Sequence, residues 1–225
     1  MQNEKEQIKI SEKINDFFQK NRKGALVSLG AIIILFVGFI VFISMQDFFR
    51  KKAINEVEEL NSKFENIRYS LNDEEFFNDI ETLLDELNNF AKSKSGFAGS
   101  KAWTLIAQIH GGREDWQKAQ EAWLNAAKTG DKTYLAPISL FNAAAAAEEQ
   151  GNLSEAIELL QKCIAHRFEF PAAPRAQFSI GRLYEELGNY PAAIEAYRSV
   201  LIDWQDVPVW QHLARSRMTS IEVGR

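Results

Sequence analysis

The stretch that decides the fold is "GRLYEELGNYPAAIEAY" (residues 181–197), which reads as two helical segments divided at Gly188. Aromatic, aliphatic and small residues recur at helical spacing on both sides of this glycine. Glycine ends a helix readily because it adopts the left-handed conformation, and Asn189 is a favoured N-cap for the helix that follows. The stretch therefore predicts two helices joined by a very short turn.

The same pattern occurs three times, because equivalent breaks fall at Glu114, Gly151 and Gly188, which are 37 residues apart. Small residues at fixed positions let two helices approach closely. A single hairpin cannot bury its apolar surface alone, so copies stack into a solenoid. The recurring positions are a capping residue (Asp115, Asn152, Asn189), an alanine (Ala119, Ala156, Ala193), a large residue (Trp123, Leu160, Tyr197) and a small residue in the first helix (Ala107, Ala144, Gly181).

The order of large, aliphatic and small residues resembles the tetratricopeptide repeat. It is visible in "AWTLIAQIHGGREDWQKAQEAWLNAA" (residues 102–127), although the period is longer than the usual length of about 34 residues. The resemblance implies an all-α solenoid of helical hairpins. We expect three such repeats over residues 100–206 and a polar capping helix over residues 207–225.

A membrane span is predicted for "GALVSLGAIIILFVGFIVFISM" (residues 24–45), which contains no charged residue. At ~1.5 Å per residue a helix of this length spans about 33 Å, enough for the bilayer core. A cleaved signal peptide fits less well, because the apolar run is long and no small-x-small cleavage site follows it. Slightly more Lys and Arg residues precede the span than follow it, which favours a cytoplasmic N-terminus and an exported C-terminal domain.

The segments on either side of the span are also predicted to be helical. Residues 1–23 form a short tail with Ile10, Ile14, Phe17 and Phe18 on one face, typical of an interfacial helix; docking to another membrane protein is the alternative. Residues 46–99 are expected to form a helical hairpin, with "SKSGFAGS" (residues 93–100) as the next turn. The apolar side of the first helix of this hairpin could mediate dimerisation. Packing of that side against the second helix of the same hairpin is favoured.

Composition and motifs exclude several function classes. A net charge of −5 argues against a nucleic-acid binder, and a single Cys excludes an intramolecular disulfide. His110, His166 and His212 have no metal-ligand or triad spacing, and no phosphate-loop motif is present. Cys163 lies at a small-residue core position, and Glu185 is expected on the solvated helix surface. We therefore expect a protein that is no enzyme, with no cofactor, metal or small-molecule substrate.

The whole layout, from "KINDFFQKNRK" (residues 13–23) through one span and a hairpin to degenerate repeats, resembles the YfgM-like family of ancillary Sec translocon subunits in bacterial inner membranes. The resemblance implies a single-pass protein of that membrane with a periplasmic repeat domain. It also implies protein partners: translocon subunits, chaperones or exported chains. The alternatives are an envelope-assembly or cell-division adaptor, and a regulatory subunit of a membrane enzyme.

A partner is expected on the concave face of the solenoid, lined by the first helix of each repeat. Phe141 and Phe178 are equivalent positions and should form an apolar strip edged by arginines, a composition typical of interface hot spots. Either this groove is open, or the hairpin of residues 55–91 fills it. Asn142 and Arg175 match two positions of a carboxylate clamp, which other tetratricopeptide domains use, whereas the other three positions do not match. The candidate residues are Thr104, Gln108, Phe141, Asn142, Arg175, Phe178, Arg182 and Arg215.

Overall fold

A computed structural model describes residues 20, 22–68, 73–166 and 170–224. The chain divides into two compact units, Met1–Lys52 and Ala53–Arg225. All regular structure in the described residues is helical, which confirms the predicted all-α class. The predicted amphipathic helix of the N-terminal tail, with Ile10, Ile14, Phe17 and Phe18, lies outside the described residues.

Helix α2 (Arg22–Arg68) carries the apolar segment of the first unit. Its large apolar side chains are exposed along the predicted span, for example Leu26 at 62%, Phe36 at 63% and Phe42 at 58%. By length and composition it is the one helix among the described residues that could cross a membrane.

The second unit begins with a hairpin made by the last turns of α2 and by α3 (Asp73–Ser93). Val57, Leu60 and Phe64 of α2 are buried against α3 and against α4 (Gly96–Gly112). This packing agrees with the favoured expectation that the first helix of the hairpin packs against its own partner helix. The buried α3 and α4 residues of the same core include Ile80, Leu83, Leu84, Leu87, Phe90, Ala102, Leu105 and Ile106.

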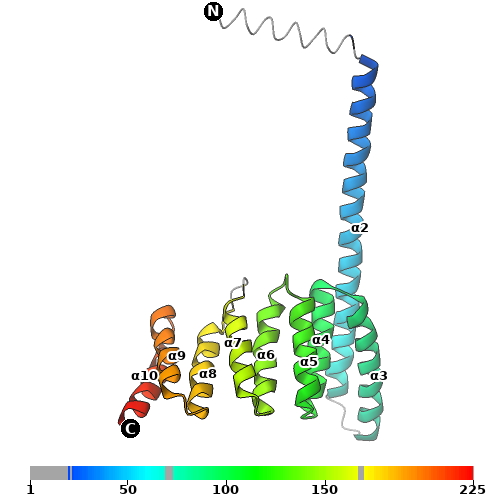
Figure 1. The fold of residues 1–225 in the computed structure, drawn as a ribbon. Helices are drawn as coiled ribbons and strands as arrows, with labels where there is room; N and C mark the ends of the chain where they lie inside the picture. Colours follow the sequence, from blue (N-terminus) through cyan, green and yellow to red (C-terminus); the bar gives the residue numbers. More distant parts are fainter. Residues whose placement is uncertain (1–19, 21, 69–72, 167–169, 225) are drawn as a thin grey trace, which may run out of the picture. The chain divides into compact units, whose positions relative to one another are not determined.

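Three helical hairpins and a final helix complete the second unit, and each helix packs on the next along the chain (Figure 1). The first hairpin pairs α4 with α5. The other elements are α5 (Trp116–Thr129), α6 (Leu135–Glu149), α7 (Leu153–Ile164), α8 (Ala173–Glu186), α9 (Tyr190–Asp203) and α10 (Pro208–Val223). The segment predicted as a turn over residues 93–100 is mostly helix, because its small residues pack closely: Ala98, Gly99 and Ser100 are buried in α4.

The three predicted breaks are the turns between paired helices. Glu114, Gly151 and Gly188 have φ of 59°, 76° and 70°. At each turn two backbone N–H groups donate back into the first helix. In the third repeat Gly188 N donates to Glu185 O at 2.9 Å and Asn189 N donates to Tyr184 O at 2.8 Å, which is the Schellman pattern. The side chains of Asp115 and Asn189 also cap the second helix, whereas that of Asn152 does not.

Close packing inside each hairpin depends on the predicted small residues. Gly181 of α8 lies under the ring of Tyr197 of α9, and a Cβ added to Gly181 would lie 2.5 Å from Tyr197 Cε1. Tyr197 is fully buried as a result. In the second hairpin Cys163 is buried, and its thiol donates to Pro137 O at 3.1 Å. Burial raises the pKa of Cys163 to about 12, which accords with an unreactive core thiol.

Candidate interaction surface

The first helices of the repeats, α4, α6 and α8, form one side of the second unit together with α10. Helix α4 contacts α6, and α8 contacts α10, in addition to the contacts between helices consecutive in the chain. First helices are thus closer to one another than second helices are at these two junctions. We call the side formed by α4, α6, α8 and α10 the concave face, as the repeat pattern predicts, and these four helices contain all the residues predicted to bind a partner.

The centre of the concave face is an aromatic and arginine cluster. The ring of Phe141 in α6 lies 5.5 Å from the ring of Phe170, and the guanidinium carbon of Arg175 in α8 lies 5.2 Å from the Phe141 ring centroid. Arg175 is exposed, and within the described part of the chain no carboxylate pairs with it. An exposed cation held over an aromatic face is preorganised to meet an anionic group.

Phe178, the equivalent of Phe141 one repeat later, has different neighbours. Its ring lies 5.1 Å from Tyr197 and 5.5 Å from Trp210 of α10. Phe141 packs with the core of the second and third hairpins, and Phe178 packs with the last core. In place of the continuous strip expected from their equivalence, the two rings therefore belong to separate clusters, because Phe170 and Trp210 supply closer partners.

The other candidate arginines differ in their charge balance. Arg182 donates from Nη2 to both carboxylate oxygens of Glu148, at 2.7 and 2.6 Å, and lies 3.7 Å from Glu186. These hydrogen bonds and charges raise the pKa of Arg182 and leave its positive charge compensated within the chain. Arg215 of α10 is exposed, and no carboxylate among the described residues pairs with it. Arg175 and Arg215 are thus better placed than Arg182 to meet an external anion.

Two of the polar candidate residues donate hydrogen bonds to backbone carbonyl groups of their own helices. Thr104 donates its hydroxyl to Ser100 O at 3.0 Å, and Asn142 donates from Nδ2 to Ile138 O at 2.9 Å. Gln108 is exposed at the far end of the array, where it lines a hollow of about 620 Å³ together with Phe64 and Ile80. Phe141 and Asn142 of α6 and Arg175 of α8 therefore lie on neighbouring first helices. Thr104 and Gln108 lie apart from them, on α4.

The sequence did not reveal a network that joins the last three helices. Glu185, expected on the solvated surface, is only 11% exposed at its side chain. It accepts hydrogen bonds from the Tyr197 hydroxyl and from Arg217 Nε, the latter at 3.0 Å. Burial favours the neutral acid, but the Arg217 and Tyr197 hydrogen bonds outweigh it and lower the pKa of Glu185. The expectation failed because the partners come from α9 and α10.

A repeated ion pair accompanies this network and could have been found from the period. Glu148 and Glu185 are equivalent positions, 37 residues apart, near the ends of α6 and α8. Each accepts from an arginine of the next first helix, Arg182 in α8 or Arg217 in α10. The two pairs fasten successive first helices together, so these charges serve the solenoid itself.

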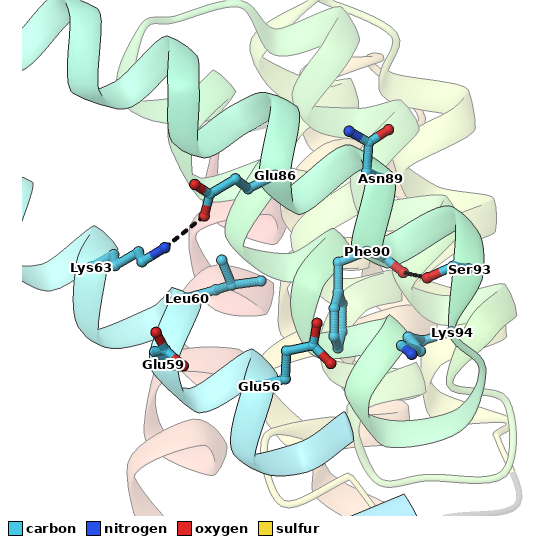
Figure 2. A pocket seen from close by; sticks show the side chains of 9 residues that line it. All are labelled: Glu56, Glu59, Leu60, Lys63, Glu86, Asn89, Phe90, Ser93 and Lys94. Carbon is cyan, nitrogen blue, oxygen red and sulfur yellow. Dashed lines mark hydrogen bonds and ion pairs between the residues drawn. The ribbon is translucent and has the colours of Figure 1, made fainter. Parts of the chain in front are cut away.

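A separate hollow of about 490 Å³ lies between α2 and α3, and Figure 2 shows the side chains that line it. Lys63 Nζ donates to Glu86 Oε2 at 2.8 Å across it, and this hydrogen bond raises the pKa of Lys63. Leu60 and Phe90 are the buried residues of its lining. Glu56 and Glu59 add acidic groups and Lys94 adds a basic one, so charges of both signs line this hollow.

Within residues 20, 22–68, 73–166 and 170–224, no group of three or more His, Cys, Asp or Glu residues could hold a metal ion. His110 is mostly buried, with Nδ1 3.9 Å from Asp115 Oδ2, and burial lowers its pKa. The side chain of His110 is thus packed at the end of α4 beside the turn that Asp115 follows.

Comparison with known proteins agrees with this geometry. Two tetratricopeptide-repeat family profiles match the chain, over residues 104–165 and 147–216. This part of the chain consists of tetratricopeptide repeats. Tetratricopeptide repeats typically serve as protein-interaction modules, so residues 104–216 are indicated to be a scaffold for protein–protein contacts.

A similar curated protein is a TPR repeat-containing protein from Treponema pallidum (strain Nichols), 38% identical over 148 residues. The match covers 64% of this chain and 60% of that protein, so the chain spans under two thirds of its relative. Among solved structures, the TPR-like repeats of a candidate kinesin light chain from Podosopora anserina are similar with a TM-score of 0.53. The identity is 18%, with 75% of this chain and 89% of that chain covered. A variant of the same Podosopora protein gives a TM-score of 0.54. At this identity the likeness concerns the fold alone.

Proposed function

We propose that this chain is a membrane-anchored interaction scaffold of a bacterial inner membrane, with its tetratricopeptide domain in the periplasm beside the Sec translocon. The observation that carries the proposal is the exposed apolar surface of α2, which precedes a tetratricopeptide array in one chain. The resemblance of its sequence layout to the YfgM-like family supports the choice of the translocon. An anchor raises the effective concentration of the repeats near partners in the same membrane.

The concave face is the proposed docking surface, with Phe141 and Arg175 at its centre. Arg175 offers an exposed guanidinium over an aromatic ring, and the chain supplies it with no carboxylate among the described residues. Arg215 adds a second exposed cation on α10. Together they favour an extended partner segment that carries carboxylates, which accept charge-assisted hydrogen bonds from arginine. Thr104, Gln108, Asn142, Phe178 and Arg182 would line the rest of this face.

The proposed role is tested by purifying the detergent-solubilised full chain and probing for translocon subunits. Co-purification is expected. Replacing residues 1–45 with a cleaved signal sequence should abolish it, because the repeats lose their place in the membrane. Co-purification with cell-wall or outer-membrane assembly factors, and not with the translocon, would instead favour an envelope-assembly adaptor. A stoichiometric catalytic chain in the complex would favour a regulatory subunit.

The docking surface is tested with the same complex and two matched variants. R175Q removes the exposed cation over Phe141, and loss of an arginine hot spot of about 2 kcal/mol would lower partner recovery roughly thirty-fold. R198Q is the control, because Arg198 is an exposed arginine of α9 that pairs with Glu195 of its own helix. Equal recovery with both variants would place the partner elsewhere.

A further inference from the structure

The residues that follow the apolar segment of α2 change abruptly from apolar to cationic. Phe48 and Phe49 form an edge-to-face pair with ring centroids 5.8 Å apart, and both rings are exposed. Arg50, Lys51 and Lys52 come directly after them and are exposed as well. Successive residues of a helix point about 100° apart, so the three cations cover a wide arc of the helix surface.

The three cations differ in whether a carboxylate of the chain compensates their positive charge. Arg50 donates from Nη2 to Asp47 Oδ1 at 2.9 Å, one turn earlier in the helix. No carboxylate among the described residues pairs with Lys51 or Lys52. By contrast, Lys63, which lies further along α2, is engaged by Glu86. Lys51 and Lys52 are therefore the charges that an external anion would meet.

We propose that Lys51 and Lys52, assisted by Arg50, bind the phosphate groups of anionic phospholipids where the apolar segment of α2 leaves the bilayer. The inference rests on the proposed membrane anchor and is independent of its orientation, since both leaflets present headgroups. It commits to lipid because the apolar surface that continues to Phe49 would contact acyl chains. At ~1.5 Å per residue, Lys51 lies about 9 Å beyond Met45, near the outer edge of a headgroup layer that is roughly 5–8 Å deep.

The test uses the full chain in detergent micelles that contain equal amounts of phosphatidylglycerol and phosphatidylcholine, with bound lipids counted by native mass spectrometry. Phosphatidylglycerol should be retained preferentially. K51Q/K52Q should lose this preference, by about five-fold per charge removed. D47N should increase it, because it removes a carboxylate and frees Arg50. K128Q/K132Q is the matched control, with two exposed lysines of the repeat domain, and should behave as the parent does.

Several results would overturn the inference. They are unchanged phosphatidylglycerol retention in K51Q/K52Q, an equal loss in K128Q/K132Q, lower retention in D47N, or displacement of the lipid by 10-fold molar excess inorganic phosphate. Carbonate extraction of membranes distinguishes a failure of the proposed lipid site from a failure of the proposed membrane anchor. A chain that stays in the membrane without a phosphatidylglycerol preference contradicts the lipid site alone. A chain released by carbonate contradicts the anchor and the lipid site together.

Discussion

Glu114 holds the left-handed position that glycine occupies in the two later repeats. Its φ is 59°, against 76° for Gly151 and 70° for Gly188. A residue with a Cβ is strained there, at a cost of roughly 1–2 kcal/mol, although glycine gives back part of this through the entropy of the unfolded chain. The first turn thus has the same backbone hydrogen bonds as the other two turns, but its left-handed position holds a glutamate, which is less suited to a positive φ than glycine.

The substitution E114G should therefore stabilise the protein. We expect the free energy of unfolding to rise by up to about 1 kcal/mol, measured by thermal or denaturant unfolding of the full chain in detergent. E114A separates backbone strain from charge, because alanine keeps the Cβ; it should leave stability within about 0.5 kcal/mol of the parent. A destabilised E114G variant would mean that the Glu114 side chain contributes to the turn.

At the scale of helices, the approach of α8 to α9 is set by Gly181. The aromatic ring of Tyr197 occupies the space in which a side chain at residue 181 would stand. This contact lies inside the stretch of residues 181–197 that predicts the fold. The glycine at residue 188 makes the turn, and the glycine at residue 181 allows the two helices to meet.

G181A should destabilise the last hairpin. A methyl group there would lie 2.5–2.8 Å from three atoms of the Tyr197 ring, and overpacking of this kind costs typically about 1–3 kcal/mol. G112A is the matched control, because a Cβ at this helical glycine meets nothing within 4 Å. Chemical denaturation should show a loss for G181A only. Equal stability of the two variants would contradict the packing described for Tyr197.

The contacts of Glu185 give α10 a dependence on pH. The pKa of Glu185 is lowered in the folded protein, so its ionised form adds stability above the pKa of the unfolded chain. That stability is lost as the pH falls through the lowered folded value. We expect acidification to weaken the attachment of α10 before the rest of the array, measured by hydrogen exchange of α10 between pH 7 and pH 3.

E185Q tests this account, because the amide cannot ionise. The variant should be less stable than the parent near neutral pH, and the acid-dependent part of α10 exchange should disappear. E149Q serves as the control, since Glu149 is exposed near the end of α6 and no ion pair engages it in the described part of the chain. An unchanged pH profile in E185Q would show that another group governs α10.

The sequence predicts those features that depend on local chemistry. The left-handed turns at Gly151 and Gly188, the caps at Asp115 and Asn189 and the small residue at 181 each follow from residue type and a fixed period. The network of Glu185, Tyr197 and Arg217 depends on how three helices come together, and a charged residue near a helix end gives no sign of that. The division of Phe141 and Phe178 into separate clusters likewise depends on Phe170 and Trp210, which lie outside the repeated positions.

At the scale of the whole molecule, the proposed function depends on two surfaces of the described residues. One is the exposed apolar length of α2 in the first unit. The other is the concave face of the tetratricopeptide domain, where Arg175 lies over Phe141. The proposed membrane scaffold requires both an anchor and a docking face within one chain. The central claim is therefore that α2 spans the membrane and delivers the repeats to its far side.

The most direct measurement is a topology reporter fused after Arg225 in a bacterial host, with alkaline phosphatase active only in the periplasm and β-galactosidase active only in the cytoplasm. The membrane fraction should carry alkaline phosphatase activity without β-galactosidase activity. Active β-galactosidase, or a fusion found in the soluble fraction, would contradict a periplasmic tetratricopeptide domain held by a membrane span.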